Sequence, residues 1–178
     1  PFWFRSNQFG SIAPDNIAMS FTPSVLKNFR YTDNRKVDWS AALNGRLNIG
    51  ENSDFTLIEG YAKLRYRKLE LAAGRLKNAA GLRDTVLSSG SFSISGNAPG
   101  IPGIYLSLPD FFLIPYFGRL FAFRGNFAHA WLGNTQMRRL ERDTVVINTF
   151  LHQKTFYGRF GKPEWRWKLY GGFTHQVL

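Results

Sequence analysis

Apolar and polar residues alternate with period two along much of the chain. In residues 36–49 one parity is aliphatic or aromatic, and the other is charged, amide or hydroxyl. The apolar set is Val37, Trp39, Ala41, Leu43, Leu47 and Ile49, and the polar set is Lys36, Asp38, Ser40, Asn44, Arg46 and Asn48. Successive side chains of a β-strand point to opposite faces of its sheet, so the pattern predicts a strand with one apolar and one polar face.

Three other segments repeat this alternation. Residues 55–67 set Ile58, Ala62, Leu64 and Tyr66 against Glu59, Lys63, Arg65 and Arg67. In 119–132, Phe121, Phe123, Phe127 and Trp131 oppose Arg124 and Asn126. In 165–177, Trp165, Trp167, Leu169 and Phe173 oppose Arg166, Lys168 and Tyr170. We expect the first set of this last segment to face lipid and the second to face a water-filled lumen.

No helical periodicity is sustained, and the chain predicts a run of strands. Their expected ranges are 2–10, 18–31, 36–49, 55–67, 68–76, 103–109, 119–132, 144–160 and 165–177. Several exceed the usual strand of about 5–6 residues and match the roughly 9–11 residues of a tilted membrane strand. The fold class predicted is therefore all-β, an antiparallel transmembrane outer-membrane β-barrel.

Outer-membrane barrels have short turns at one end and longer loops at the other, and the connections between the predicted strands follow this pattern in part. The breaks at Arg67–Lys68 and 161–164 are tight, whereas 78–103 and 133–143 are long and fall on the other side of the sheet. Nine strands is an odd number, and single-chain bacterial barrels have even numbers. We therefore expect residues 1–178 to form a single β-barrel domain, an incomplete portion of about 8–10 strands, with 90–96 as a candidate extra strand.

Composition agrees with a barrel that has lipid outside and a basic lumen. The chain is 16% aromatic and carries a net charge of +11. A nucleic-acid-binding protein would explain the charge but not 17 Phe residues, so no nucleic-acid partner is expected. No apolar run approaches the roughly 20 residues of a membrane helix, and there is no cysteine for a disulfide or a thiolate metal site.

Candidate catalytic chemistry is sparse. His129, His152 and His175 lie 23 residues apart on three successive predicted strands, without a carboxylate at ligand spacing. The serines near Ser88 have no nearby histidine, as a nucleophile would need. We expect no enzyme, no metal and no cofactor. The 23 cations exceed the 12 carboxylates, however, and arginine in particular recognises carboxylate and phosphate groups.

Four stretches carry a family resemblance: "SNQFGSI", "GYAKLRYRKLELAAGR", "LSSGSFSISGNAPGIPGI" and "FLHQKTFYGRFGKPEWRWKLYGGFTHQV". They resemble the capsule assembly Wzi family in its Bacteroidetes form. The resemblance implies a barrel of about eighteen strands in the bacterial outer membrane that acts as a lectin and holds exported capsular polysaccharide. It also implies that residues 1–178 are the N-terminal portion of that barrel. The chain departs from the family at Pro99–Gly100, where an arginine is expected.

From the cation excess and the resemblance together we expect an outer-membrane, lectin-like protein that helps assemble or retain the capsule. Its expected partners are an acidic capsular or surface polysaccharide, outer-membrane lipid and lipopolysaccharide, and the capsule export machinery. The expected polysaccharide-binding residues are Arg83, Arg138, Arg139 and Arg142 in outer loops, with Arg124 and Lys168 facing inward. An anion-preferring porin is the alternative function. An outer-membrane lipase and a soluble β-sandwich remain as further alternatives.

Overall fold

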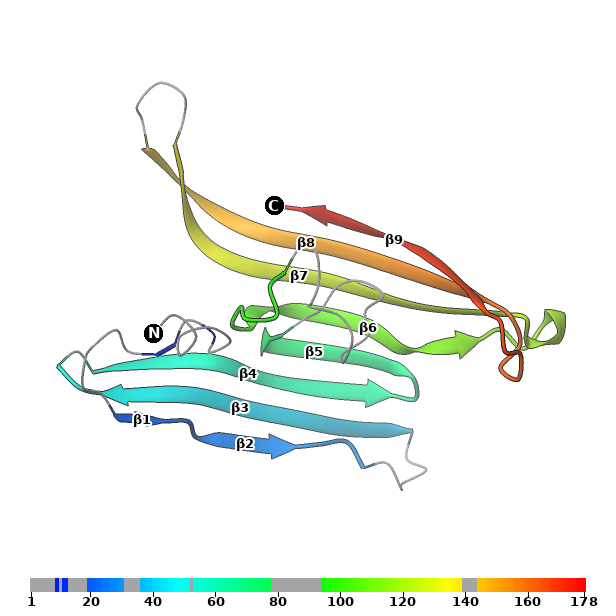
Figure 1. Ribbon diagram of the computed structural model, residues 1–178, viewed down its shortest axis with the longest axis horizontal. Coiled ribbons are helices and arrows are strands. Elements are labelled where there is room, and N and C mark those ends of the chain that lie inside the picture. Colours follow the sequence, from blue (N-terminus) through cyan, green and yellow to red (C-terminus); the bar gives the residue numbers. More distant parts are fainter. Residues whose placement is uncertain are drawn as a thin grey trace. The chain divides into compact units, whose positions relative to one another are not determined.

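The computed structural model describes residues 9, 11–12, 19–30, 36–51, 53–77, 94–138 and 144–178, with the backbone alone for 135–138 and 144–147. These residues form β-strands joined by turns, and one short 3-10 helix at Phe117–Arg119 (Figure 1). No helix among them is long and apolar enough to cross a membrane. The strands are β1 Met19–Phe21, β2 Ser24–Lys27, β3 Val37–Ile49, β4 Asp54–Tyr66, β5 Leu69–Leu76, β6 Ile101–Leu113, β7 Phe121–Arg138, β8 Thr144–Phe160 and β9 Leu169–Val177.

The strands belong to one antiparallel sheet with the order β1-β3-β4-β5-β6-β7-β8-β9, and β2 pairs with β3 beside β1. Among the described residues no pairing joins the first strand to the last, so the sheet is open. The all-β, antiparallel prediction is confirmed. The chain divides into two compact units, and each is described by itself below.

Several predicted strand boundaries hold, and others shift. The predictions for 36–49, 55–67, 68–76 and 144–160 agree with β3, β4, β5 and β8. The 18–31 prediction covers two short strands, β1 and β2. Of the predicted strand 2–10, all but Phe9 lies outside the described residues. Ile94–Gly96, the described end of the candidate extra strand, is not a strand.

Two predicted ends are wrong. Residues 133–138 were expected in an outer loop, but β7 continues to Arg138 and pairs with the start of β8 after an irregularity between Trp131 and Gly133. The last strand begins at Leu169, and residues 161–168 form the connection before it. Gly161 turns the chain there with φ 123°, a value that glycine adopts readily. The alternation of apolar and polar residues in 165–168 therefore belongs to the connection and does not indicate a strand.

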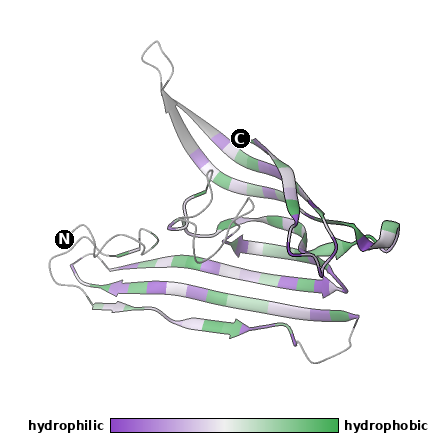
Figure 2. Cartoon of the chain, turned by 45° about the vertical axis from the view of Figure 1, so that its right-hand side comes forward, coloured by the Kyte–Doolittle hydropathy of each residue, from purple (hydrophilic) through white to green (hydrophobic). Residues whose placement is uncertain are grey.

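In the first unit the polar face of the sheet is covered and the apolar face is exposed. Figure 2 shows the alternation of hydrophobic and hydrophilic residues along β3 and β4. On β3, Trp39 is 54% exposed and Leu43 57%, whereas Ser40 and Asn48 are buried. The Asn48 amide donates to the Ser11 carbonyl oxygen at 2.7 Å, and its Oδ1 accepts from the Ser20 hydroxyl at 2.6 Å. This polarity is opposite to that of a soluble sheet, in which the apolar face is the buried one.

Ile58 is an exception to the predicted parity. The β3–β4 register shifts between Asn44 and Gly45, so that Asn44 pairs with Glu59 while Gly45 pairs with Leu57. Ile58 is the extra residue of this bulge and is 1% exposed, on the covered side. The expectation that Ile58 shares the outward parity of Leu64 and Tyr66 is therefore wrong, because one inserted residue reverses the alternation.

The second unit has the same polarity on β7 and β8, whereas on β9 both sides are exposed except at Gln176. Phe121 pairs with Phe160, which pairs with Leu169, and all three side chains are exposed. Most residues on the opposite side of β7 and β8 are buried. Ala128 and Gln153, for example, pair with each other and are fully buried. We call the two sides of β7, β8 and β9 the apolar face and the polar face.

Adjacent glycines on β9 give a test of this packing. A Cβ on Gly172 would overlap the Phe156 carbonyl oxygen and the Tyr157 ring, whereas a Cβ on Gly171 would meet no atom within 4 Å. We expect Gly172→Ala to lower the free energy of unfolding by about 1–3 kcal/mol, because Tyr157 must move. Gly171→Ala is the matched control, with a change under about 0.5 kcal/mol. Denaturant titration of the refolded protein measures both, and equal losses would contradict the register between β8 and β9.

Candidate functional site

The structure places two of the six predicted binding residues with their side chains. Arg124 lies on the polar face of β7, as predicted. Lys168 does not lie on the polar face of a strand; it is half-buried in the 161–168 connection beside Gly161. The expectation that it faces inward from a strand is wrong. Arg138 lies in β7, and Arg83, Arg139 and Arg142 lie outside the described residues.

The Arg124 guanidinium lies between two aromatic rings. Its Cζ is 5.2 Å from the ring centre of Phe111 on β6 and 5.4 Å from that of Tyr157 on β8. Tyr157 is the β8 partner of Arg124, so the pairing itself brings the ring beside the cation. Contacts of this kind attract the cation through the quadrupole of the ring and leave the N–H donors of the guanidinium available.

Arg159 completes the basic part of the site. The sequence pattern placed it on the polar parity but did not select it as a binding residue. Its Cζ lies 5.7 Å from the Phe111 ring centre, and its strand partners are Ala122 and Tyr170. The Nε and Nη2 atoms of Arg159 are buried and have no hydrogen-bond partner among the described residues. Buried donors of this kind usually have a partner, so these two atoms mark a place where an acceptor would be stabilised.

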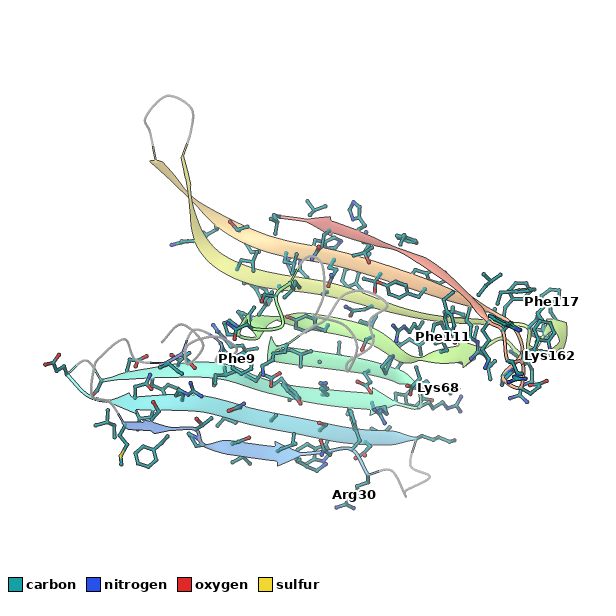
Figure 3. The ribbon with its side chains drawn as sticks, in the orientation of Figure 1. Phe9, Arg30, Lys68, Phe111, Phe117 and Lys162 are labelled. Atoms are coloured by element: carbon teal, nitrogen blue, oxygen red, sulfur yellow. The ribbon has the colours of Figure 1, made fainter. Side chains whose placement is uncertain are left out.

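Two tyrosines form the rest of the site. Tyr170 on β9 is 51% exposed and packs edge-on against Phe111, with ring centres 5.6 Å apart. The Tyr157 hydroxyl lies 2.8 Å from the Thr174 hydroxyl, which fixes the ring against β9. We call these five residues, Phe111, Arg124, Tyr157, Arg159 and Tyr170, the arginine–aromatic patch (Figure 3 labels Phe111).

The three strands that carry the arginines and tyrosines of the patch lack carboxylates. Strands β7, β8 and β9 contain no Asp or Glu at any position. In the first unit, by contrast, Lys77 is 3.6 Å from the Glu59 carboxylate, and Asp38 accepts the backbone N–H of Arg30 at 2.6 Å.

This arrangement suits binding more than bond cleavage. The guanidinium groups present planar N–H donors to carboxylate or phosphate oxygens, and an exposed tyrosine ring can stack on the apolar face of a sugar. The patch contains no carboxylate, imidazole or serine to serve as base or nucleophile. Within the described residues, no group of three or more His, Asp or Glu side chains could hold a metal ion.

Trp165 and the three histidines lie away from the patch. The Trp165 ring packs against Phe160, 6.4 Å between ring centres, so it joins the apolar face although it is not in a strand. His129 and His152 pair across β7 and β8 on the apolar face, with ring centres 6.0 Å apart. Comparison of the chain with protein-family models, with curated proteins and with solved structures finds no match.

Proposed function

We propose that the chain forms part of the wall of an outer-membrane β-barrel that binds an acidic capsular or surface polysaccharide through its polar face. The membrane placement is supported by the inverted polarity of the sheet, since an exposed apolar face beside a covered polar face is typical of a strand between lipid and a wet interior. A capsule-assembly role of this barrel agrees with the family resemblance of the sequence.

The observation that carries the binding proposal is the arginine–aromatic patch. The Arg124 and Arg159 guanidiniums are held by rings and not by carboxylates, and two Arg159 nitrogens have no acceptor among the described residues. Tyr170 adds an exposed ring beside them. An acidic sugar offers both a carboxylate for the guanidiniums and a C–H face for the ring. Repetition of such modest contacts along a polymer would supply the affinity.

Removing the charge of the patch tests this proposal. We expect Arg124→Gln with Arg159→Gln to weaken binding of a uronic-acid-containing capsular polysaccharide at least about tenfold, because each lost charged hydrogen bond is worth roughly 1.5 kcal/mol or more. Lys162→Gln, in the connection after β8, removes a cation outside the patch and should leave binding unchanged. Equal effects of the two changes, or equal binding of the carboxyl-reduced polymer, would refute the charge-specific site.

A second function, an anion-preferring porin, is favoured by the same uncompensated charge on β7–β9. A pore needs no stacking ring, and it needs a continuous water path. Conductance of the intact protein in a planar bilayer separates the two functions. An ohmic current with anion preference that falls in the double glutamine variant supports the porin; absence of current with saturable polysaccharide binding supports the lectin.

A further inference from the structure

A row of uncharged polar side chains crosses β6 to β9 on the polar face, next to the arginine–aromatic patch. Asn126 on β7 pairs with Ser107 on β6 and with Thr155 on β8, and Thr155 pairs with Thr174 on β9. We call these four residues the neutral polar row. Asn126 follows Arg124 by two residues, so the row lies on the same face, about 7 Å further along the strand.

Asn126 provides a hydrogen-bond donor that the protein does not use. Its side chain is half-buried, and its Nδ2 atom is buried without a hydrogen-bond partner among the described residues. Buried donors in this state are rare, because leaving one unpaired costs free energy. Arg159 in the patch has two buried nitrogens in the same state. The patch and the row therefore both offer donors to acceptors that the described part of the chain does not supply.

Two hydroxyl groups connect the row to the patch at β9. The Thr174 side chain is exposed, and its hydroxyl lies 2.8 Å from the hydroxyl of Tyr157, a member of the patch. In such a pair one hydroxyl donates to the other, and the hydrogen of the second stays available to a ligand. A ligand on the patch is therefore within reach of the row.

The chemistry of the row suits a neutral sugar better than an acidic one. Amide and hydroxyl side chains both donate and accept hydrogen bonds, as the hydroxyl and acetamido groups of a neutral sugar do. A carboxylate only accepts, and its charge would lose water here without a cation in the row to replace it. A site built from hydrogen-bonding groups discriminates against a ligand that leaves them unpaired.

We propose that the neutral polar row is a second sugar subsite, which binds a neutral sugar linked directly to the acidic sugar on the arginine–aromatic patch. The ligand is then a heteropolymer in which acidic and neutral sugars are neighbours, and not a polymer of acidic sugars alone. The two-residue step from Arg124 to Asn126 is comparable to the length of one sugar in such a chain. The inference rests on the polysaccharide-binding function proposed above.

Two oligosaccharides of equal length test the subsite by isothermal titration calorimetry of the intact protein in detergent. One is a hyaluronan octasaccharide, in which glucuronate alternates with N-acetylglucosamine. The other is a glucuronan octasaccharide, in which every sugar is glucuronate. At about 0.15 M salt, which screens long-range attraction, we expect hyaluronan to bind at least about tenfold tighter, because only its neutral sugars pair fully with the row.

Substitutions in the row should remove this preference without weakening the acidic polymer. We expect Asn126→Ala with Ser107→Ala to reduce the affinity ratio of the two oligosaccharides to about twofold or less, since each lost hydrogen bond is worth a few-fold in affinity. Glucuronan affinity should stay within about twofold, which also shows that the variant is folded. Asn148→Ala removes an exposed amide from the opposite side of β8 and is the matched control that should keep the ratio.

The outcomes separate this inference from the proposed function. Equal or tighter binding of glucuronan to the native protein, or a hyaluronan preference that survives the double alanine variant, overturns the neutral subsite. Arg124→Gln with Arg159→Gln should weaken both oligosaccharides alike, and this result beside either of those leaves the acidic site standing alone. Failure of both oligosaccharides to bind the native protein refutes the acidic site and the neutral subsite together.

Discussion

Replacing Phe156 with arginine should lower the free energy of unfolding of the protein in lipid bilayers by about 2–4 kcal/mol. This is the range measured for arginine near the middle of an outer-membrane barrel. Phe156 is exposed on the apolar face of β8, between Phe150 and Phe160, which are exposed on the same face. Its ring also packs on Phe123 at 5.9 Å and Phe173 at 6.2 Å. The charged side chain would lose these contacts and place a guanidinium in hydrocarbon.

Two controls separate lipid exposure from packing. Phe156→Leu keeps an apolar side chain, and we expect it to cost less than about 1.5 kcal/mol. Gln176→Arg adds the same charge to the polar face of β9, next to Gln153, and should cost less than about 1 kcal/mol. Urea titration of folding into vesicles, followed by the mobility of unheated samples on gels, gives all three values. Equal losses in Phe156→Arg and Gln176→Arg would show that neither face is lipid-exposed.

Gly74→Ala in β5 should destabilise the first unit by about 3–5 kcal/mol. Gly74 has φ 120°, a region that residues with a Cβ adopt only with strain of roughly 1–3 kcal/mol. A Cβ there would also overlap the Gly60 carbonyl oxygen and lie 2.8 Å from the Tyr61 Cα, and neither backbone atom can rotate away. Overpacking of this kind adds about 1–3 kcal/mol.

Gly60→Ala is the matched control for that prediction. A Cβ on Gly60 would make ordinary contacts with Leu57 and Leu43 at 3.4–3.6 Å, on the exposed side of β4. We expect the free energy of unfolding to change by no more than about 0.5–1 kcal/mol, measured by the same denaturant titration. A Gly74→Ala protein as stable as Gly60→Ala would show that β5 does not approach β4 as closely as these distances require.

The period-two pattern predicted most of the sheet because a strand with different environments on its two faces must alternate. In β7 it correctly separated Phe121, Phe127 and Trp131 from Arg124 and Asn126. It failed where the backbone departs from a regular strand. Ile58 lies in a bulge and Lys168 lies in a turn, so sequence parity there no longer reports the face.

The candidate site was predictable only in part. Arg124 stands out as a cation on the polar parity of an aromatic strand, but its partners Phe111 and Tyr157 come from two other strands. Phe111 lies within the register irregularity between Leu108 and Phe112, which the alternation does not reveal.

We propose that the apolar face of the sheet contacts lipid while the polar face contacts water. Spin labels at single cysteines on β9 of the intact protein in vesicles test it most directly. Labels at 169, 173 and 177 should be relaxed by oxygen and protected from a water-soluble nickel chelate, and labels at 170, 174 and 176 should show the opposite. Equal nickel accessibility at both parities would contradict the claim and indicate a β-sheet with water on both sides.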